Sequence, residues 1–147
     1  MVRVINPESA GKERTQLLRA VVLALRELMQ QQQPDLATKD LSAFIALALE
    51  NIAATIDQSV AAWEKRDYWV KADRFRMDWD WSRRLGIVMR QAVTDEDWPK
   101  VASTAAEVAM RVNAVKVPQR HKLGTPWVGA YQKLLQEHGT PSSPPRR

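Results

Sequence analysis

The feature that most constrains this chain is a stretch of 57 residues, from Thr38 to Thr94, that contains no proline. Proline interrupts helices, so its absence permits long ones. Apolar residues recur through the chain at spacings of three and four and do not alternate, which indicates amphipathic helices and not strands. The sequence therefore predicts an all-α protein. One helix over the whole stretch would be too long for a domain of 147 residues, so a reversal is expected within it.

The first expected helix starts at Asn6, a favourable N-cap residue, with Pro7 in the first helical position. Pro34 ends it. The second expected helix starts between residues 35 and 38 and continues to about Arg66. Its apolar side includes a regular series of core positions. These are Leu41, Ile45, Ala48, Leu49, Ile52, Ile56 and Trp63.

We place the reversal at residues 65–68, with Asp67 as the cap of a third helix that spans residues 68–93. The competing interpretation is one continuous long helix. The fourth expected helix follows the acidic run at residues 94–97, with Asp97 as its cap, and Pro118 ends that element.

A short last helix is expected to start at the Thr125-Pro126 pair and to stop at Gly139. Four substantial helices with short connections predict an antiparallel four-helix bundle in up-down-up-down order, on which the short fifth helix packs through Trp127. We expect one domain over residues 1–138. Residues 139–147, rich in proline, serine and arginine, are expected to be disordered.

Composition excludes several kinds of chemistry. The chain has no cysteine, which rules out disulfides, thiolate catalysis and cysteine-based zinc sites. It has no long uninterrupted apolar run and no secretion signal at its start, so we expect a soluble cytoplasmic protein without a membrane partner. The formal net charge of +5 favours anionic partners, although it is too modest to identify one.

The segment from Tyr68 to Arg84 concentrates large aromatic residues among charges of both signs. Its apolar residues form two lines on the expected third helix, and a helix with two apolar faces lies between neighbours or offers one face to a partner. Arg74 and Asp78 lie between the two lines. If that region is buried they must pair, because an unpaired buried charge is costly. The alternative is an aromatic docking face in which Arg74 binds an acidic group.

The leading hypothesis is a non-enzymatic protein that acts through protein–protein contacts, either with a second copy of itself or with another chain. Tryptophan and arginine are the residue types most enriched at interface hot spots. Leu47 adds to the argument because it lies off the apolar side of the second helix. The expected partner-binding residues are Leu47, Trp69, Arg74, Phe75, Asp78, Trp79 and Trp81.

The main alternative is binding to nucleic acid through phosphate contacts, which would make affinity fall steeply with salt. Acidic residues interrupt the basic ones, and the chain carries no recognised nucleic-acid motif. The residues that would carry this function are Lys65, Arg66, Arg83, Arg84, Lys116, Arg120, His121 and Lys122.

A third hypothesis is a metal-dependent nucleotide hydrolase. The chain resembles all-α nucleotide pyrophosphatases in size and helix count, and that resemblance implies magnesium held by Glu-x-x-Glu and Glu-x-x-Asp pairs. The sequence Glu64-Lys65-Arg66-Asp67 matches the second pair. The first pair is missing, because the residue three positions after Glu50 is Ala53 and not an acid. We therefore expect no metal, cofactor or catalytic residue. The seven-residue spacing of Glu50, Asp57 and Glu64 is interpreted as a solvent-facing pattern.

Overall fold

The structure is a computed structural model that describes residues 7–139, and every regular element in that range is a helix. The all-α prediction is confirmed. The described helices are α1 (Pro7–Leu28), α2 (Leu36–Lys65), α3 (Trp69–Asp78), α4 (Asp80–Thr94), α5 (Trp98–Arg111) and α6 (Ala130–Gly139). The expected cap at Asn6 and the expected disordered tail beyond Gly139 lie outside the described residues.

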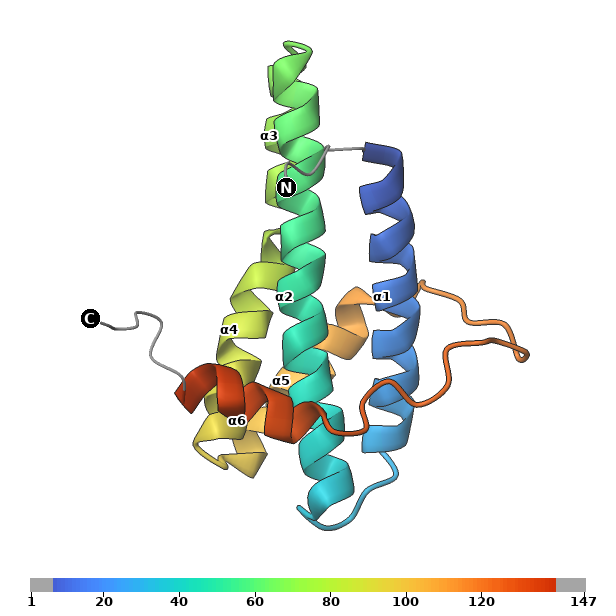
Figure 1. Ribbon diagram of the computed structural model, residues 1–147, viewed down its shortest axis with the longest axis vertical. Helices are drawn as coiled ribbons and strands as arrows, with labels where there is room; N and C mark the ends of the chain where they lie inside the picture. Colours follow the sequence, from blue (N-terminus) through green and yellow to red (C-terminus); the bar gives the residue numbers. More distant parts are fainter. Residues whose placement is uncertain (1–6, 140–147) are drawn as a thin grey trace.

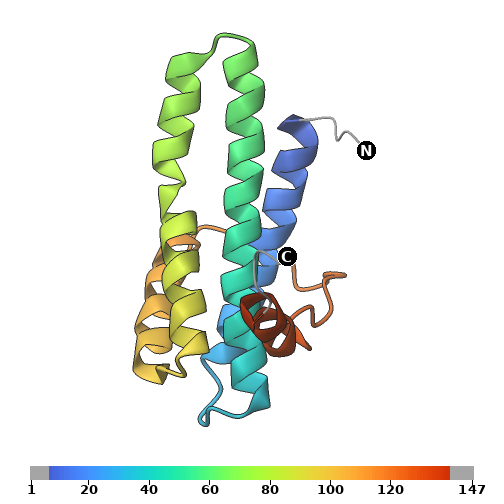
Figure 2. The same ribbon diagram turned by 60° about the vertical axis from the view of Figure 1, so that its left-hand side comes forward.

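The central helix of the fold is α2. Helices α1, α3, α4 and α6 all pack against it, whereas α5 packs on α4 and barely touches α1. Figures 1 and 2 show α1 on one side of α2 and the α3–α4 pair on the other, with α6 crossing near the start of α2. The hairpin formed by α2 and α3 extends beyond the remaining helices.

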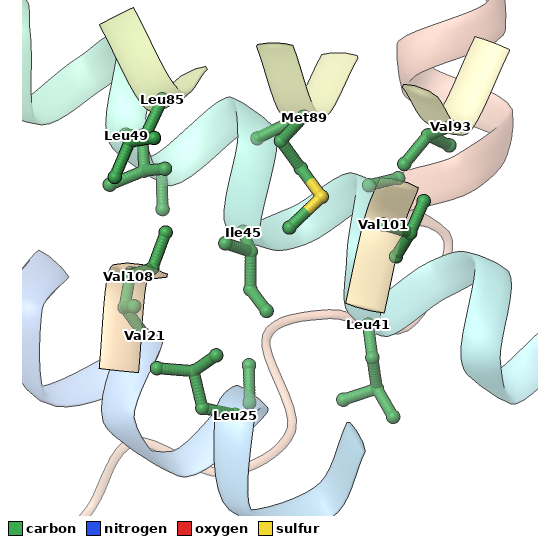
Figure 3. Close-up of a cluster of buried hydrophobic side chains, with 14 of the residues drawn as sticks. Val21, Leu25, Leu41, Ile45, Leu49, Leu85, Met89, Val93, Val101 and Val108 are labelled. Atoms are coloured by element: carbon green, nitrogen blue, oxygen red, sulfur yellow. The ribbon is translucent and has the colours of Figure 1, made fainter. Parts of the chain in front are cut away.

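Leucine and isoleucine side chains of α2 occupy the middle of the main core (Figure 3). Side chains from α1, α4 and α5 meet them there, and full burial of each such side chain stabilises the fold by roughly 2–3 kcal/mol. The labelled members are Val21, Leu25, Leu41, Ile45, Leu49, Leu85, Met89, Val93, Val101 and Val108. By length and composition α2 is also the one described helix that could cross a membrane, but 61% of its most apolar window is buried inside the chain.

The single third helix predicted for residues 68–93 is interrupted at Trp79, which separates α3 from α4. The hydroxyl of Ser82 donates to the carbonyl oxygen of Trp79 at 2.7 Å, and the backbone there leaves helical geometry. The indoles of Trp79 and Trp81 stack with ring centroids 5.8 Å apart. Residues two apart point to different sides of a continuous helix, so this stack requires the interruption.

Two helices end in Schellman motifs that use an acidic residue where glycine is usual. The amide of Tyr68 donates to the carbonyl of Trp63 at 2.9 Å, with Asp67 between them at φ +64°. Asp67 therefore terminates α2, and the prediction that it caps the third helix is wrong. The same arrangement ends α4, where Glu96 has a φ of +54°. Acids occupy these positions because the left-handed conformation is disfavoured but not forbidden for them.

The predicted cap at Asp97 is confirmed, and Asp35 caps α2 within the range predicted for its start. The Asp35 carboxylate accepts the amide of Thr38 at 3.1 Å at the start of α2. The Asp97 carboxylate accepts the amide of Lys100 at 3.2 Å at the start of α5. Both side chains satisfy amides that have no partner inside the first turn of their helices.

The last helix begins at Ala130, not at the predicted Thr125-Pro126 pair. Gly129 precedes it with a φ of +85°, a left-handed conformation that a helix cannot include. The cap comes from α2 instead. The buried carboxylate of Asp40 accepts the amides of Gly129 at 3.1 Å and Tyr131 at 3.0 Å. Asp40 thus fixes α6 against α2 through a contact that no local sequence pattern shows.

Helices α2 and α4 approach each other closely at Gly86. A Cβ atom added there would lie 3.2 Å from the Cβ of Leu49, which is tighter than ordinary van der Waals contact. Glycine at this position therefore allows the two backbones to come together, and its low helix propensity is offset by that packing.

We expect Gly86→Val to lower the free energy of unfolding by about 1–3 kcal/mol, because the added methyl groups would force α2 and α4 apart. Gly11→Ala is the matched control. The nearest atom to a Cβ at Gly11 is 4.0 Å away, so that change is expected to stabilise α1 by about 0.5–1 kcal/mol. Urea unfolding followed by circular dichroism measures both. Equal effects of the two changes would contradict the close approach.

Glu96→Gly is expected to raise the free energy of unfolding by about 0.5–1 kcal/mol, since glycine adopts the left-handed conformation without a Cβ penalty. Ala106→Gly, in the exposed middle of α5, should lower it by about the same amount. Thermal unfolding of the two variants checks the opposite signs, and destabilisation by Glu96→Gly would count against the assigned backbone conformation.

Candidate functional site

Four aromatic rings form a row between α2 and the α3–α4 break. Trp63 contacts Phe75 edge-on at 4.8 Å between centroids, and Phe75 lies 6.1 Å from Trp79, which stacks on Trp81. Trp81 is 8% exposed, and Phe75 and Trp79 are half-buried and pack against the buried core. The expected role of Trp81 as a partner-binding anchor is corrected accordingly: its indole is part of the core in this conformation.

Among the described residues two cations contact this aromatic row: the ammonium nitrogen of Lys71 lies 4.5 Å from the ring centroid of Trp63, and Arg14 of α1 contacts the next two rings. Its guanidinium donates to the hydroxyl of Thr55 at 3.1 Å, to the carbonyl of the same residue at 3.1 Å and to the hydroxyl of Ser59 at 2.8 Å. It also lies 4.9 Å from the ring centroid of Phe75 and 5.7 Å from that of Trp79. Arg14 therefore joins α1, α2 and the end of α3 through hydrogen bonds and cation–π contacts.

Partial burial lowers the pKa of Arg14 from its ordinary value, but the group stays charged because arginine titrates so far above neutral pH. Sequence reasoning did not single out this residue. A signal was present, since Arg14 lies three residues before Leu17 and seven before Val21 and so shares the apolar face of α1. An arginine on an apolar face was the indication of a buried cation.

Of the two alternatives for Arg74 and Asp78, the structure contradicts the buried pair. Both side chains are exposed, and within residues 7–139 neither takes part in an ion pair. The reason is that α3 packs on α2 alone over most of its length, so the side that carries Arg74 faces outward. Leu47, which was expected to lie off the apolar side of α2, is half-buried and packs against the main core.

The three acids at seven-residue spacing on α2 do not form a free solvent-facing row. Each pairs with an arginine of α3 or α4, and those arginines also lie seven residues apart. A terminal guanidinium nitrogen lies 2.7 Å from a carboxylate oxygen in the pair of Arg90 with Glu50, 2.7 Å in that of Arg83 with Asp57 and 2.8 Å in that of Arg76 with Glu64. The three carboxylates remain 30–61% exposed, so the prediction that they face solvent holds in part, but their spacing matches an inter-helix charge ladder and not solvent alone.

The ladder fixes how α2 pairs with α3 and α4. The paired residues approach one another in sequence toward the hairpin turn, as an antiparallel pair requires. Each exposed ion pair contributes at most about 1 kcal/mol, so the ladder sets register more than it sets stability. The hydrogen bond to Glu50 raises the pKa of Arg90, in agreement with this pairing.

The largest exposed apolar side chains of the hairpin gather on α3 and the turn before it. Tyr68 is 51% exposed, Trp69 55%, Val70 75% and Met77 76%. Val70 and Met77 are two turns apart on one side of α3, with Arg74 between them, and they border a shallow open hollow. We call Tyr68, Trp69, Val70, Arg74 and Met77 the α3 surface. Trp69 and Arg74 belong to the predicted partner-binding residues, whereas Tyr68, Val70 and Met77 were not among them.

The basic residues of the nucleic-acid hypothesis do not form one surface. Lys65 and Arg66 lie at the end of the hairpin, while Lys116, Arg120, His121 and Lys122 lie on the connection between α5 and α6, at a distant place in both views (Figures 1 and 2). Arg83 pairs with Asp57, and Arg84 lies 3.9 Å from Glu107. The loop and the hairpin would have to contact nucleic acid separately.

Within residues 7–139 no three histidine or acidic side chains are placed to hold a metal ion together. Glu64, half of the acidic motif, accepts a hydrogen bond from Arg76, and Asp67 lies in the turn that ends α2. Comparison with protein-family models, with curated proteins and with solved structures finds no match to this chain. The candidate site therefore depends on the geometry of this chain alone.

Arg14→Ala is expected to lower the free energy of unfolding by about 2 kcal/mol, because it removes three hydrogen bonds from a charged donor and two ring contacts. Arg74→Ala is the control and should stay within about 0.5 kcal/mol of the unchanged protein. Chemical denaturation with tryptophan fluorescence separates the two. The reverse order of effects would restore Arg74 as the buried cation.

Proposed function

We propose that this chain works without catalysing a reaction, by binding another protein chain through the α3 surface. The partner is either a second copy or a different protein. We further propose that it works in the cytoplasm and that α1, α2, α3–α4 and α5 are best regarded as an antiparallel four-helix bundle with α6 across it.

The observation that carries the proposal is the exposure of four large apolar side chains on one short helix and its turn. Water contact with apolar surface is unfavourable, and a partner that covers the α3 surface would remove it. Arg74 adds a charged donor between Val70 and Met77, and within the described chain it has no ion-pair partner. Aromatic residues, methionine and arginine are also enriched at protein interfaces.

Several contacts hold the helix that carries the α3 surface in place. Trp63 of α2 packs against Phe75 of α3, and Arg14 joins the end of α3 to α1. Two ion pairs of the charge ladder, those of Arg76 and Arg83, lie on either side of the α3–α4 break. An interface on a rigid element costs less conformational entropy on binding than one on a loop. This favours docking to a preformed surface.

Trp69→Ala is expected to weaken association by about 2 kcal/mol, or roughly thirtyfold, as loss of an interface anchor does. Ile87→Ala, which removes a side chain that is 60% exposed on α4, should have no effect. Sedimentation velocity over a wide range of protein concentration measures self-association. A photo-crosslinker at Met77 in cell extract, compared with one at Ile87, detects a different partner.

Self-association or site-specific crosslinking that disappears with Trp69→Ala, while circular dichroism is unchanged, would support the proposal. A chain that stays monomeric and gives no crosslink at Met77 beyond that at Ile87 would refute it. Loss of folding in Trp69→Ala would assign the indole to the core and would equally count against the α3 surface.

A further inference from the structure

Helices α1 and α5 both contribute side chains to the main core, but their backbones come close at few positions, and an apolar groove lies between them. Its central hollow has a volume of about 330 Å³. The lining residues are Leu25, Leu28, Met29, Ala102, Ala105, Ala106 and Ala109. Every one of these side chains is apolar, so the groove exposes apolar surface between α1 and α5.

The groove continues at both ends. A hollow of about 230 Å³ shares Leu28 and Ala102 with the central one and reaches Trp98. Another, of about 210 Å³, shares Met29 and Ala109 and reaches as far as Val115. At 1.5 Å per residue, the α5 side from Val101 to Val112 is roughly 16 Å long, which is the length of about three turns of a partner helix.

The lining favours a helix as the occupant. Alanine side chains let the backbone of a neighbouring helix come close, and ridges of larger side chains on that helix can then fill the hollows. Met29 is 80% exposed at the margin, and flexible methionines adapt to the shape of a helix laid beside them. A small apolar molecule would fill only the central hollow, whereas a helix laid along α5 would also reach the hollows at both ends.

The charge of the groove selects the kind of helix. Arg26 is the one charged residue that lines any of the three hollows, and no acid of the described chain lines them. Within residues 7–139 Arg26 takes part in no ion pair. A helix with an acidic residue beside its apolar stripe would supply the missing partner at that end, and charge of the opposite sign across an interface improves specificity.

We propose that the α1–α5 groove is a second docking site, which binds an amphipathic helix of another protein through apolar anchors and an acidic residue that pairs with Arg26. This site is separate from the α3 surface and does not depend on it. Helix α5 and the later half of α1, whose residues line the groove, lie toward the end of the fold opposite the hairpin turn (Figure 2), so both sites can be occupied at once. The chain would then connect two partners.

The test uses a fluorescent synthetic peptide of about five helical turns, with leucines on one face and glutamates beside them, and a comparison peptide with lysine at each glutamate. Fluorescence anisotropy with the full chain gives the dissociation constants. The acidic peptide is expected to bind roughly tenfold more tightly than the basic one. Arg26→Glu is expected to reverse that preference.

Ala106→Trp should abolish binding by filling the central hollow from an exposed position on α5. Ala54→Trp, at an exposed position of α2 outside the groove, is the matched control and should bind like the unchanged protein. Trp69→Ala should leave peptide binding unchanged, so failure of the α3 proposal and failure of this one are distinguishable. Equal binding of the two peptides, no binding, or full binding by a folded Ala106→Trp variant would overturn the inference.

Discussion

The fold depends on covering α2. Its buried residues face several directions, so one packed neighbour could not remove them from water. Helices α1 and α4 cover it on either side, and α6, fixed by the Asp40 carboxylate, covers a third region near its beginning. Gly86 permits a close approach of α4. Helix α5 adds side chains to the same core but packs its backbone mainly on α4, and a groove remains between it and α1.

The hairpin beyond this core is stabilised differently. Few helices cover α3, so its attachment uses aromatic contacts, the Arg14 guanidinium and the charge ladder in place of a large apolar core. The same limited cover leaves Trp69, Val70 and Met77 in water. The proposed docking function and the lighter packing of the hairpin therefore have one structural cause.

Sequence patterns located most helices because local chemistry decides them. Asp97 caps a helix as expected, Asp35 caps α2 within the range expected for its start, and the apolar spacing on α2 matches its buried positions. One failure is local: Asp67 resembles an N-cap by its position before a helix, yet it adopts the left-handed conformation that ends α2. Another depends on a distant residue, because the start of α6 follows from Gly129 together with an acid 89 residues earlier.

The candidate site shows the same division. The concentration of aromatic residues at 68–81 identified the region, but it could not say which indole is buried, because that depends on where α1 and α2 lie. The seven-residue spacing of the acids on α2 can be read from the sequence. That these acids form ion pairs cannot, because Arg76, Arg83 and Arg90 repeat the spacing on a different segment and the two series meet only when the helices pack.

By itself the sequence determined that the chain is helical and, through proline, caps and apolar periodicity, approximately where the larger helices lie. These are properties of neighbouring residues, whose backbone and side-chain preferences act within a turn or two. The tertiary structure decided that Arg14 and not Arg74 is the partly buried cation, that Trp81 is core and Trp69 is accessible, and that α1 and α5 leave a groove. Each of these depends on contacts between segments far apart in the chain, and burial exists only once those segments have packed.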